Sequence, residues 1–147
     1  MNNQTILLVE DNDDDAELTI KAFEQVDPGR LIARAADGVD ALDYLLRRGL
    51  HVGLAALALP AVVLLDLKLP RKNGIEVLTA IRAEASTRHL PVVVLTSSAE
   101  DKDRLAAYDQ HANSYVRKPV DYEQFVAAAR QLARYWMVLN LGLPRAS

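Results

Sequence analysis

The sequence predicts an α/β protein with a doubly wound, five-stranded parallel sheet and five helices. Short runs rich in Val, Ile and Leu alternate five times with stretches whose apolar residues repeat at helical spacing. Two of these runs end on acid: residues 6–9 precede Glu10 and Asp11, and residues 62–65 precede Asp66. Open parallel sheets bind their ligands at the C-terminal ends of their strands, so these carboxylates point to a functional pocket.

Five strands are expected along the chain. The first, third and fourth are continuous apolar runs, which is typical of strands buried on both faces of a parallel sheet. The second is more polar, so we expect it at an edge of the sheet. The predicted strands are residues 6–9, 31–35, 62–65, 92–95 and 114–116.

The helices between these strands are predicted from apolar residues that share one helical face, at residues 16–26, 42–46 and 75–81. Breakers such as Pro28, Pro70 and Pro91 separate the elements. No repeat, low-complexity tract or linker divides the chain, so residues 1–147 are expected to form one domain.

The connection over residues 49–60 is long and apolar for a loop. It has two interpretations: an extended second helix with a packed loop, or an insert that binds a partner.

The last helix, expected at about residues 121–141, has apolar residues on two faces. Such a helix usually buries both faces, so we expect one face to cover the sheet and the other to meet a partner. The predicted interface residues are Tyr122, Phe125, Val126, Tyr135 and Trp136.

Composition bounds the class of protein. The chain has 147 residues, 50% hydrophobic and 25% charged, as is usual for one globular domain. A net charge of −3 does not indicate the basic surface that nucleic-acid binding requires. The absence of cysteine excludes disulfides and zinc–thiolate sites and suits a cytoplasmic setting. The first apolar run is too short for a signal peptide or a membrane span, so we expect no membrane partner.

Five polar residues follow or end the first, third, fourth and fifth strands: Glu10, Asp11, Asp66, Thr96 and Lys118. Taken singly, each has an ordinary explanation. Asp11 could cap the next helix, and residues 13–15 could be a solvated first turn that complements the helix dipole. The others could be loop acids, a second cap and a surface lysine.

Taken together, these five residues predict chemistry, because the switch point of a doubly wound sheet brings the strand ends into one crevice. Glu10, Asp11 and Asp66 can bind Mg²⁺, which prefers oxygen ligands. A carboxylate with a free oxygen can attack phosphorus if the phosphoryl charge is neutralised. The metal, the Lys118 ammonium and the Thr96 hydroxyl would supply that stabilisation.

These residues resemble the receiver domain of two-component response regulators over roughly residues 5–139. The matching segments are ILLVED at 6–11, LLDLKLP at 64–70 with Asn73-Gly74 after it, VLTS at 94–97 and YVRKP at 115–119. Their order and spacing are highly specific in combination. The resemblance implies a flavodoxin-like fold with strand order 2-1-3-4-5 and a signalling protein that is not an enzyme.

The resemblance also implies roles for single residues. Asp66 would accept a phosphoryl group from a histidine kinase. Asp11, Asp66 and the backbone carbonyl of Lys68 would ligate Mg²⁺, with Glu10 acting mainly through water. Thr96 and Lys118 would stabilise the phosphoryl group, Thr96 and Tyr115 would form the switch pair, and the peptide bond before Pro119 is expected to be cis.

A narrower resemblance concerns the partner. The segment AYDQHANSY at 107–115, the long second connection and the helix ending in Tyr135-Trp136 are similar to single-domain regulators that partner phytochrome kinases. Dimers in this family pair through the fourth helix, fifth strand and fifth helix, so we expect a homodimer, with output by protein contact or dimerisation.

Three alternatives remain open at this point. The chain could be a receiver for a non-phytochrome kinase that acts as a phosphorelay shuttle, or a receiver used only as an unphosphorylated dimerisation module. It could also be a flavodoxin-like nucleotide binder, although the acids after the first strand would repel a phosphate that lacks a metal.

Overall fold

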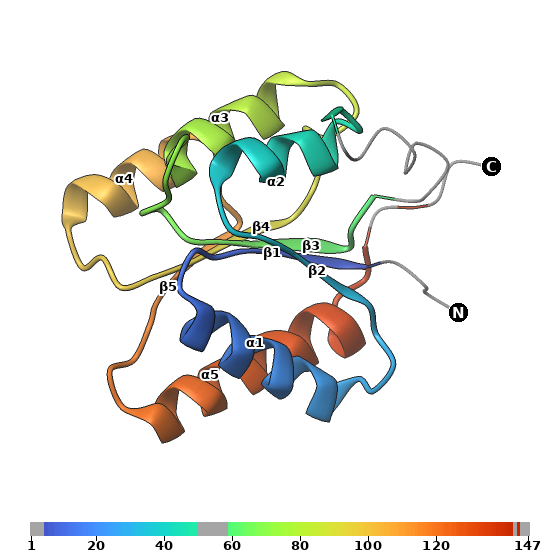
Figure 1. Ribbon diagram of the computed structural model, residues 1–147, viewed down its shortest axis with the longest axis vertical. Coiled ribbons are helices and arrows are strands. Elements are labelled where there is room, and N and C mark those ends of the chain that lie inside the picture. The colour runs from blue at the N-terminus through green and yellow to red at the C-terminus, as the bar shows by residue number, and fades with distance from the viewer. Residues whose placement is uncertain (1–4, 50–58, 143, 145–147) are drawn as a thin grey trace.

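The computed structural model describes residues 5–49, 59–142 and 144, and it has the predicted fold class (Figure 1). Five parallel strands form one sheet in the order β2-β1-β3-β4-β5, so the predicted strand order is confirmed. The strands are β1 (Ile6–Val9), β2 (Ile32–Ala35), β3 (Val62–Leu65), β4 (Val92–Thr96) and β5 (Ser114–Arg117).

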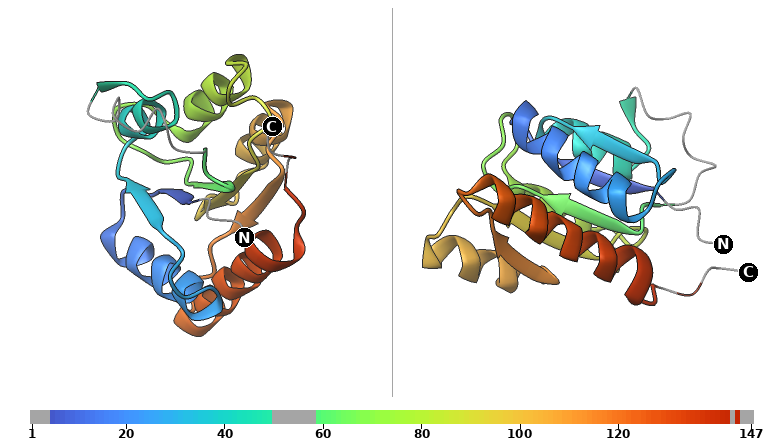
Figure 2. Two further views of the ribbon diagram at one scale, coloured as in Figure 1. Left: turned by 90° about the vertical axis from the view of Figure 1, so that its right-hand side faces the viewer. Right: turned by 90° about the horizontal axis from the view of Figure 1, so that it is seen from below.

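Helices cover both faces of the sheet (Figure 2). One face carries α1 (Asp13–Val26) and α5 (Tyr122–Arg134), and the other carries α2 (Gly38–Leu45), α3 (Gly74–Ala83) and α4 (Asp101–Asp109). In β1, Leu7 and Val9 join the core under α2 and α3, whereas Ile6 and Leu8 join the core under α1 and α5. Both faces of the strand are buried, which explains its continuous apolar sequence.

The C-terminal helix is longer than the α5 helix itself, because a π-helical segment, η2 (Tyr135–Leu139), continues it. The expected extent of about 121–141 is therefore close to the observed one.

The interface predicted on this helix needs one correction. Phe125 is only 5% exposed and lies on the buried face with Ala129 and Ala133, because α1 packs against that face. Trp136 is partly buried against the same core. Tyr122 and Tyr135 remain exposed.

The connection at residues 49–60 is described only at its ends. Helix α2 ends at Leu45, so it does not extend to residue 49, and the prediction for residues 50–58 lies outside the described part of the chain. Over the residues that the structure describes, every helix is too short or too polar to cross a membrane.

Candidate functional site

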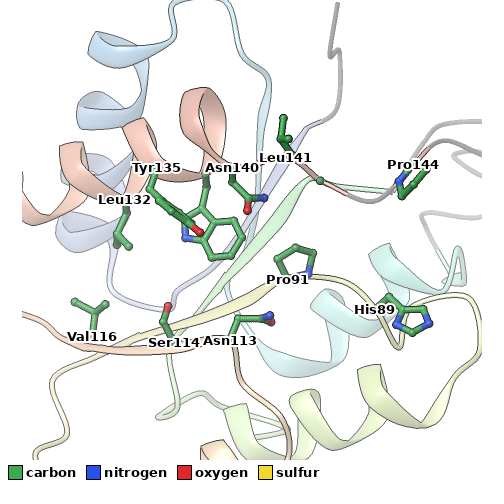
Figure 3. Close-up of a pocket in the computed structure, with 12 residues that line it drawn as sticks. His89, Pro91, Asn113, Ser114, Val116, Leu132, Tyr135, Asn140, Leu141 and Pro144 are labelled. Atoms are coloured by element: carbon green, nitrogen blue, oxygen red, sulfur yellow. The ribbon is translucent and has the colours of Figure 1, made fainter.

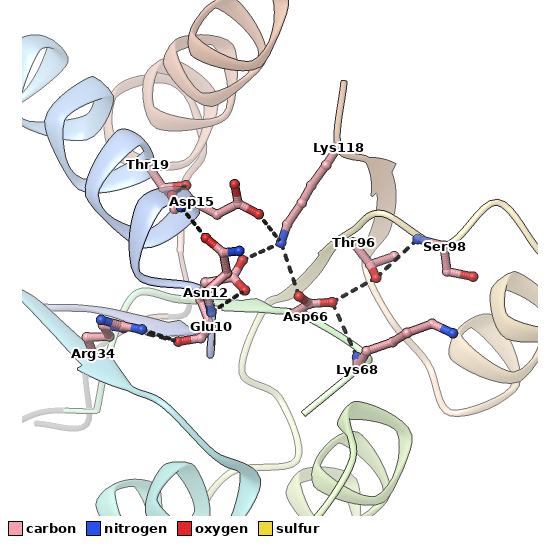
Figure 4. A network of polar contacts seen from close by, with 10 residues as sticks. All are labelled: Glu10, Asn12, Asp15, Thr19, Arg34, Asp66, Lys68, Thr96, Ser98 and Lys118. Atoms are coloured by element: carbon pink, nitrogen blue, oxygen red, sulfur yellow. Dashed lines mark hydrogen bonds and ion pairs between the residues drawn. The ribbon is translucent and has the colours of Figure 1, made fainter. Parts of the chain in front are cut away.

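The C-terminal ends of four strands converge on one polar pocket (Figure 4). Glu10 follows β1, Asp66 follows β3, Thr96 ends β4 and Lys118 follows β5. The side chains of these four residues are buried, although all four are polar. The pocket therefore lies where the sequence places it, at the switch point of the sheet.

Lys118 is the centre of the pocket. Its ammonium donates to one oxygen each of Glu10, Asp15 (3.0 Å) and Asp66 (3.1 Å). An ammonium has three N–H donors, so all of them are used. Only 7% of Lys118 is exposed, and a buried charge of this kind is tolerable only because carboxylates surround it.

Both carboxylate oxygens of Asp66 accept hydrogen bonds. Oδ1 accepts from the Thr96 hydroxyl at 2.8 Å and from the Lys68 backbone N–H at 3.3 Å, and Oδ2 accepts from Lys118. The Lys68 ammonium points away from this carboxylate (Figure 4). Each of these three hydrogen bonds favours the ionised carboxylate of Asp66, which is the nucleophilic form.

The two buried acids respond to the pocket in opposite directions. Burial opposes ionisation of Asp66, but the Lys118 charge and the Thr96 hydrogen bond keep its pKa below the ordinary value. Burial and the nearby Asp66 charge raise the pKa of Glu10 to about 7, against the opposing effect of Lys118. Although burial disfavours the ammonium of Lys118, its hydrogen bond to Glu10 and the charge of Asp66 raise its pKa.

The acids of the pocket form a candidate cation site. One oxygen each from Glu10, Asp11 and Asp66 lies within 4.8 Å of the others, and Asp11 is the exposed member that opens the cluster to solvent. Three carboxylates this close repel one another unless a cation is shared. A set of hard oxygen donors suits a divalent cation, so the residues present fit a bound metal.

Contacts with neighbouring elements fix the loops that carry these acids. The Arg34 guanidinium on β2 donates twice to the Glu10 carbonyl, at 3.0 and 2.9 Å, and pairs with Asp13 at 2.8 Å. A Cβ on Gly74, the first residue of α3, would lie 2.4 Å from the Asp66 carbonyl oxygen. Only glycine therefore allows α3 to begin directly against the Asp66 loop.

A set of hydroxyl groups extends from the pocket toward α4. The Thr96 hydroxyl accepts a long bond from the Ser98 backbone N–H at 3.4 Å, and the Ser98 hydroxyl donates to Asp103 on α4 at 2.5 Å. The Tyr115 hydroxyl, from β5, donates to the Ser98 carbonyl at 3.2 Å. The predicted switch pair is thus connected through the backbone of one residue.

One predicted feature of the pocket is wrong. The peptide bond before Pro119 is trans, because the described residues contain no cis bond. The trans form of a bond before proline is favoured by roughly 0.5–1 kcal/mol. With this trans bond, Lys118 still reaches the carboxylates, so the pocket does not need the cis form.

Sequence reasoning missed three members of the site: Asp15, Arg34 and Ser98. Asp15 was grouped with a solvated first turn, yet it contacts Lys118, and the cap of that turn is Asn12 rather than Asp11. No pattern around Arg34 indicated its role, because its partners, the Glu10 carbonyl and Asp13, follow another strand. A signal for Asp15 did exist, because it directly precedes the buried Ala16 and lies one turn before the buried Thr19.

A second hollow lies at the opposite ends of the strands (Figure 3). It has a volume of about 670 Å³ and is open to solvent, with Leu132 and Tyr135 on one side and His89 and Asn113 on another. Trp136 also lines it. It contains none of the predicted metal or phosphoacceptor residues.

Comparisons with known proteins agree with this geometry. The family model described as the response regulator receiver domain matches residues 6–130. FilR2 of Methanothrix harundinacea, a probable methanogenesis regulatory protein, is 44% identical over 135 residues, which cover 92% of this chain and 84% of that protein.

Two solved structures are similar over nearly their whole length. The phosphorylated cyanobacterial phytochrome response regulator RcpA has a TM-score of 0.89 at 31% identity, covering 96% of this chain and 99% of that one. The Mn²⁺-bound form of response regulator Rcp1 has a TM-score of 0.89 at 29% identity with the same coverage. The chain therefore belongs to the response regulator receiver family, whose members are signalling proteins of two-component systems and not classical enzymes.

Proposed function

We propose that this protein is a phosphorylation switch in which Asp66 accepts a phosphoryl group from the phosphohistidine of a histidine kinase. The observation that carries the proposal is the state of Asp66. Its carboxylate is buried in an acidic cluster, yet Lys118 and Thr96 keep it ionised. A buried carboxylate with a depressed pKa beside a cation and a hydroxyl donor is suited to act as a nucleophile.

In the transfer step, one Asp66 oxygen attacks the phosphorus of the phosphohistidine. The P–O bond of the acyl phosphate forms as the P–N bond breaks, and the electron pair of that bond leaves with the imidazole nitrogen, which takes up a proton. Lys118 and Thr96 then donate to the phosphoryl oxygens, which carry the developing negative charge.

The divalent cation of the site is, in our proposal, Mg²⁺. Glu10, Asp11 and Asp66 would hold it together with the backbone carbonyl of Lys68, and Glu10 would act mainly through water. When bound, it would neutralise charge on the transferred group. The all-oxygen donor set supports this assignment.

Thr96 and Tyr115 would convert the arrival of the phosphoryl group into a conformational change at the protein surface. The Thr96 hydroxyl is bonded to Asp66, which is where it could follow a new phosphoryl group. Tyr115 is bonded to the Ser98 carbonyl, so a shift of the Thr96–Ser98 backbone would change the environment of Tyr115 and of α4.

We propose a (bacterio)phytochrome kinase as the partner, and we propose that the phosphoryl transfer takes place in the cytoplasm. The similarity to RcpA supports it, whereas the name of FilR2 refers to methanogenesis, so relatives of this chain serve different signals. Output would pass through protein contact or a homodimer, and the exposed Tyr122 and Tyr135 are the aromatic residues available for it on the C-terminal helix.

Incubation with acetyl phosphate and Mg²⁺, followed by intact-protein mass spectrometry, tests the proposal. We expect one added phosphoryl group on the parent and none on Asp66→Asn. The exposed Asp109→Asn is the matched control and should be labelled like the parent. A parent that takes no phosphoryl group from acetyl phosphate or from any kinase in a phosphotransfer profile would leave the unphosphorylated dimerisation module as the function.

A further inference from the structure

We infer that Asp15 is a positioning residue, which keeps the Lys118 ammonium aimed at the phosphoryl group after its other carboxylate partners are engaged. The inference rests on the proposed function. It starts from the observation that Lys118 contacts three carboxylates, although only two of them belong to the candidate cation site.

The three carboxylates that contact Lys118 differ in what they would contact once a cation and a phosphoryl group are bound. The oxygens of Glu10 and Asp66 lie in the acidic cluster that suits a divalent cation, and Asp66 is also the proposed acceptor. Asp15 is outside that cluster. When a cation and a phosphoryl group engage Glu10 and Asp66, Asp15 is the carboxylate that remains free to fix the ammonium.

The position of Asp15 is fixed by its own helix turn. Its backbone N–H donates to the Asn12 side chain at 2.9 Å, and its carbonyl accepts from the buried Thr19 hydroxyl at 2.9 Å. Its side chain is 30% exposed, whereas that of Asp13, two residues before it, is 89% exposed and pairs with Arg34. The first turn of α1 therefore points this one carboxylate at Lys118.

Asp15 could instead compete with the phosphoryl group for the ammonium. The geometry opposes this alternative, because Lys118 contacts Asp15 at 3.0 Å and Asp66 at 3.1 Å at the same time. The contact with Asp15 does not withdraw the ammonium from the acceptor. The two roles predict opposite signs: a competitor would slow phosphorylation, and a positioning residue would speed it.

The test compares Asp15→Asn, which has nearly the same shape, with the parent. We expect the rate of labelling by acetyl phosphate and the affinity for beryllofluoride, a phosphoryl mimic, to fall about tenfold, as for the loss of one charge-assisted hydrogen bond. Affinity for Mg²⁺ alone, measured by calorimetry, should change less than about threefold, because Asp15 lies outside the cation site. Asp15→Glu, which keeps the charge, should recover part of the loss.

Two controls separate positioning from a general effect on the fold. Asp14→Asn, an exposed neighbour in the same turn, should behave like the parent. In a Lys118→Met background, Asp15→Asn should cause no further loss of beryllofluoride affinity, because the two residues act as a unit.

Each remaining outcome overturns the inference. Faster labelling of Asp15→Asn would indicate competition, an unchanged rate would make Asp15 a bystander, and an equal loss in the Lys118→Met background would indicate a structural role. If the parent is labelled but the Asp15 variants do not behave as expected, the proposed function stands without the role of Asp15. A parent that takes no label overturns both.

Discussion

The pocket has two halves that are built from different interactions. The charged half consists of Lys118 and its carboxylates Glu10, Asp15 and Asp66, and it lies toward α1. The hydroxyl half consists of Thr96, Ser98 and Tyr115, and it lies toward α4. Asp66 belongs to both, because one of its oxygens accepts from Lys118 and the other from Thr96.

The helices beside these halves differ in the same way. Helix α1 has a side-chain N-cap, Asn12, and four of its residues are buried. Helix α4 has no side-chain cap bond and buries only Ala107, and its Leu105 and Tyr108 are exposed. A buried ion-pair network is costly to disrupt. In the hydroxyl half, the bond from Ser98 to Asp103 is charge-assisted, but the bonds that Ser98 makes with Thr96 and Tyr115 join neutral groups and contribute only about 0.5–1.5 kcal/mol each. The comparison indicates that the charged half keeps its geometry and the hydroxyl half can move.

Replacing Lys118 should have the largest effect on stability. In Lys118→Met, three carboxylates lose their cation in a buried pocket, so we expect a loss of about 3 kcal/mol in the free energy of unfolding without metal. Saturating Mg²⁺ should restore part of it by replacing the lost charge. Urea unfolding with and without Mg²⁺ measures both effects.

The control for this variant is Lys21→Met, which removes an exposed ion pair with Glu17 on α1. It should cause no measurable loss, because such pairs are solvated and screened. An equal loss from the two lysines would mean that the charged half is not the rigid part of the pocket.

Gly74→Ala should have the next largest effect, because it pushes α3 against the loop of the acceptor. The new Cβ would lie 2.4 Å from the Asp66 carbonyl oxygen and 2.6 Å from the Leu67 Cα, so backbone must shift. We expect about 2 kcal/mol of destabilisation in urea unfolding. Gly142→Ala is the control, since nothing lies within 4 Å of that position. Equal stability of the two variants would show that the loop carrying Asp66 can shift at little cost in free energy.

The sequence predicted the charged half better than the hydroxyl half. Acids at the ends of buried strands are a local pattern, and the parallel sheet converts that pattern into a cluster. Glu10 and Asp66 could therefore be assigned to one pocket from their shared position at strand ends. The contact between Tyr115 and the Ser98 carbonyl depends on how β5 lies beside the loop after β4, and no local pattern records it.

The errors have a common physical origin. Asp15 looked like a residue that complements the dipole of its helix, because its partner Lys118 lies 103 residues away. Phe125 looked like an interface residue because periodicity shows that a face is apolar without saying which element covers it. In this molecule α1 covers it, and the long α1–α5 packing could not be read from either helix alone.

The two helix starts allow a smaller test of the same comparison. Asn12→Ala removes the cap that fixes the first turn of α1, and it should cost about 1 kcal/mol in urea unfolding. Glu100 is at the corresponding position of α4 but makes no side-chain cap bond, so Glu100→Ala should be nearly neutral. If the two variants cost the same, α4 would be anchored as firmly as α1, and the hydroxyl half would have no loosely held helix to move.

Tyr115→Phe should have the smallest effect on stability and the most specific effect on the hydroxyl half. The ring stays packed against the core, and only the bond to the Ser98 carbonyl is lost, so we expect a cost of about 0.5–1 kcal/mol. Affinity for Mg²⁺ should not change, because no contact of the charged half is touched. Amide hydrogen exchange should become faster over residues 97–109 and stay unchanged over α1, since the loop that leads into α4 loses its bond to β5. Faster exchange in both helices would mean that the two halves form one cooperative unit, and the division of the pocket into a rigid and a movable half would be wrong.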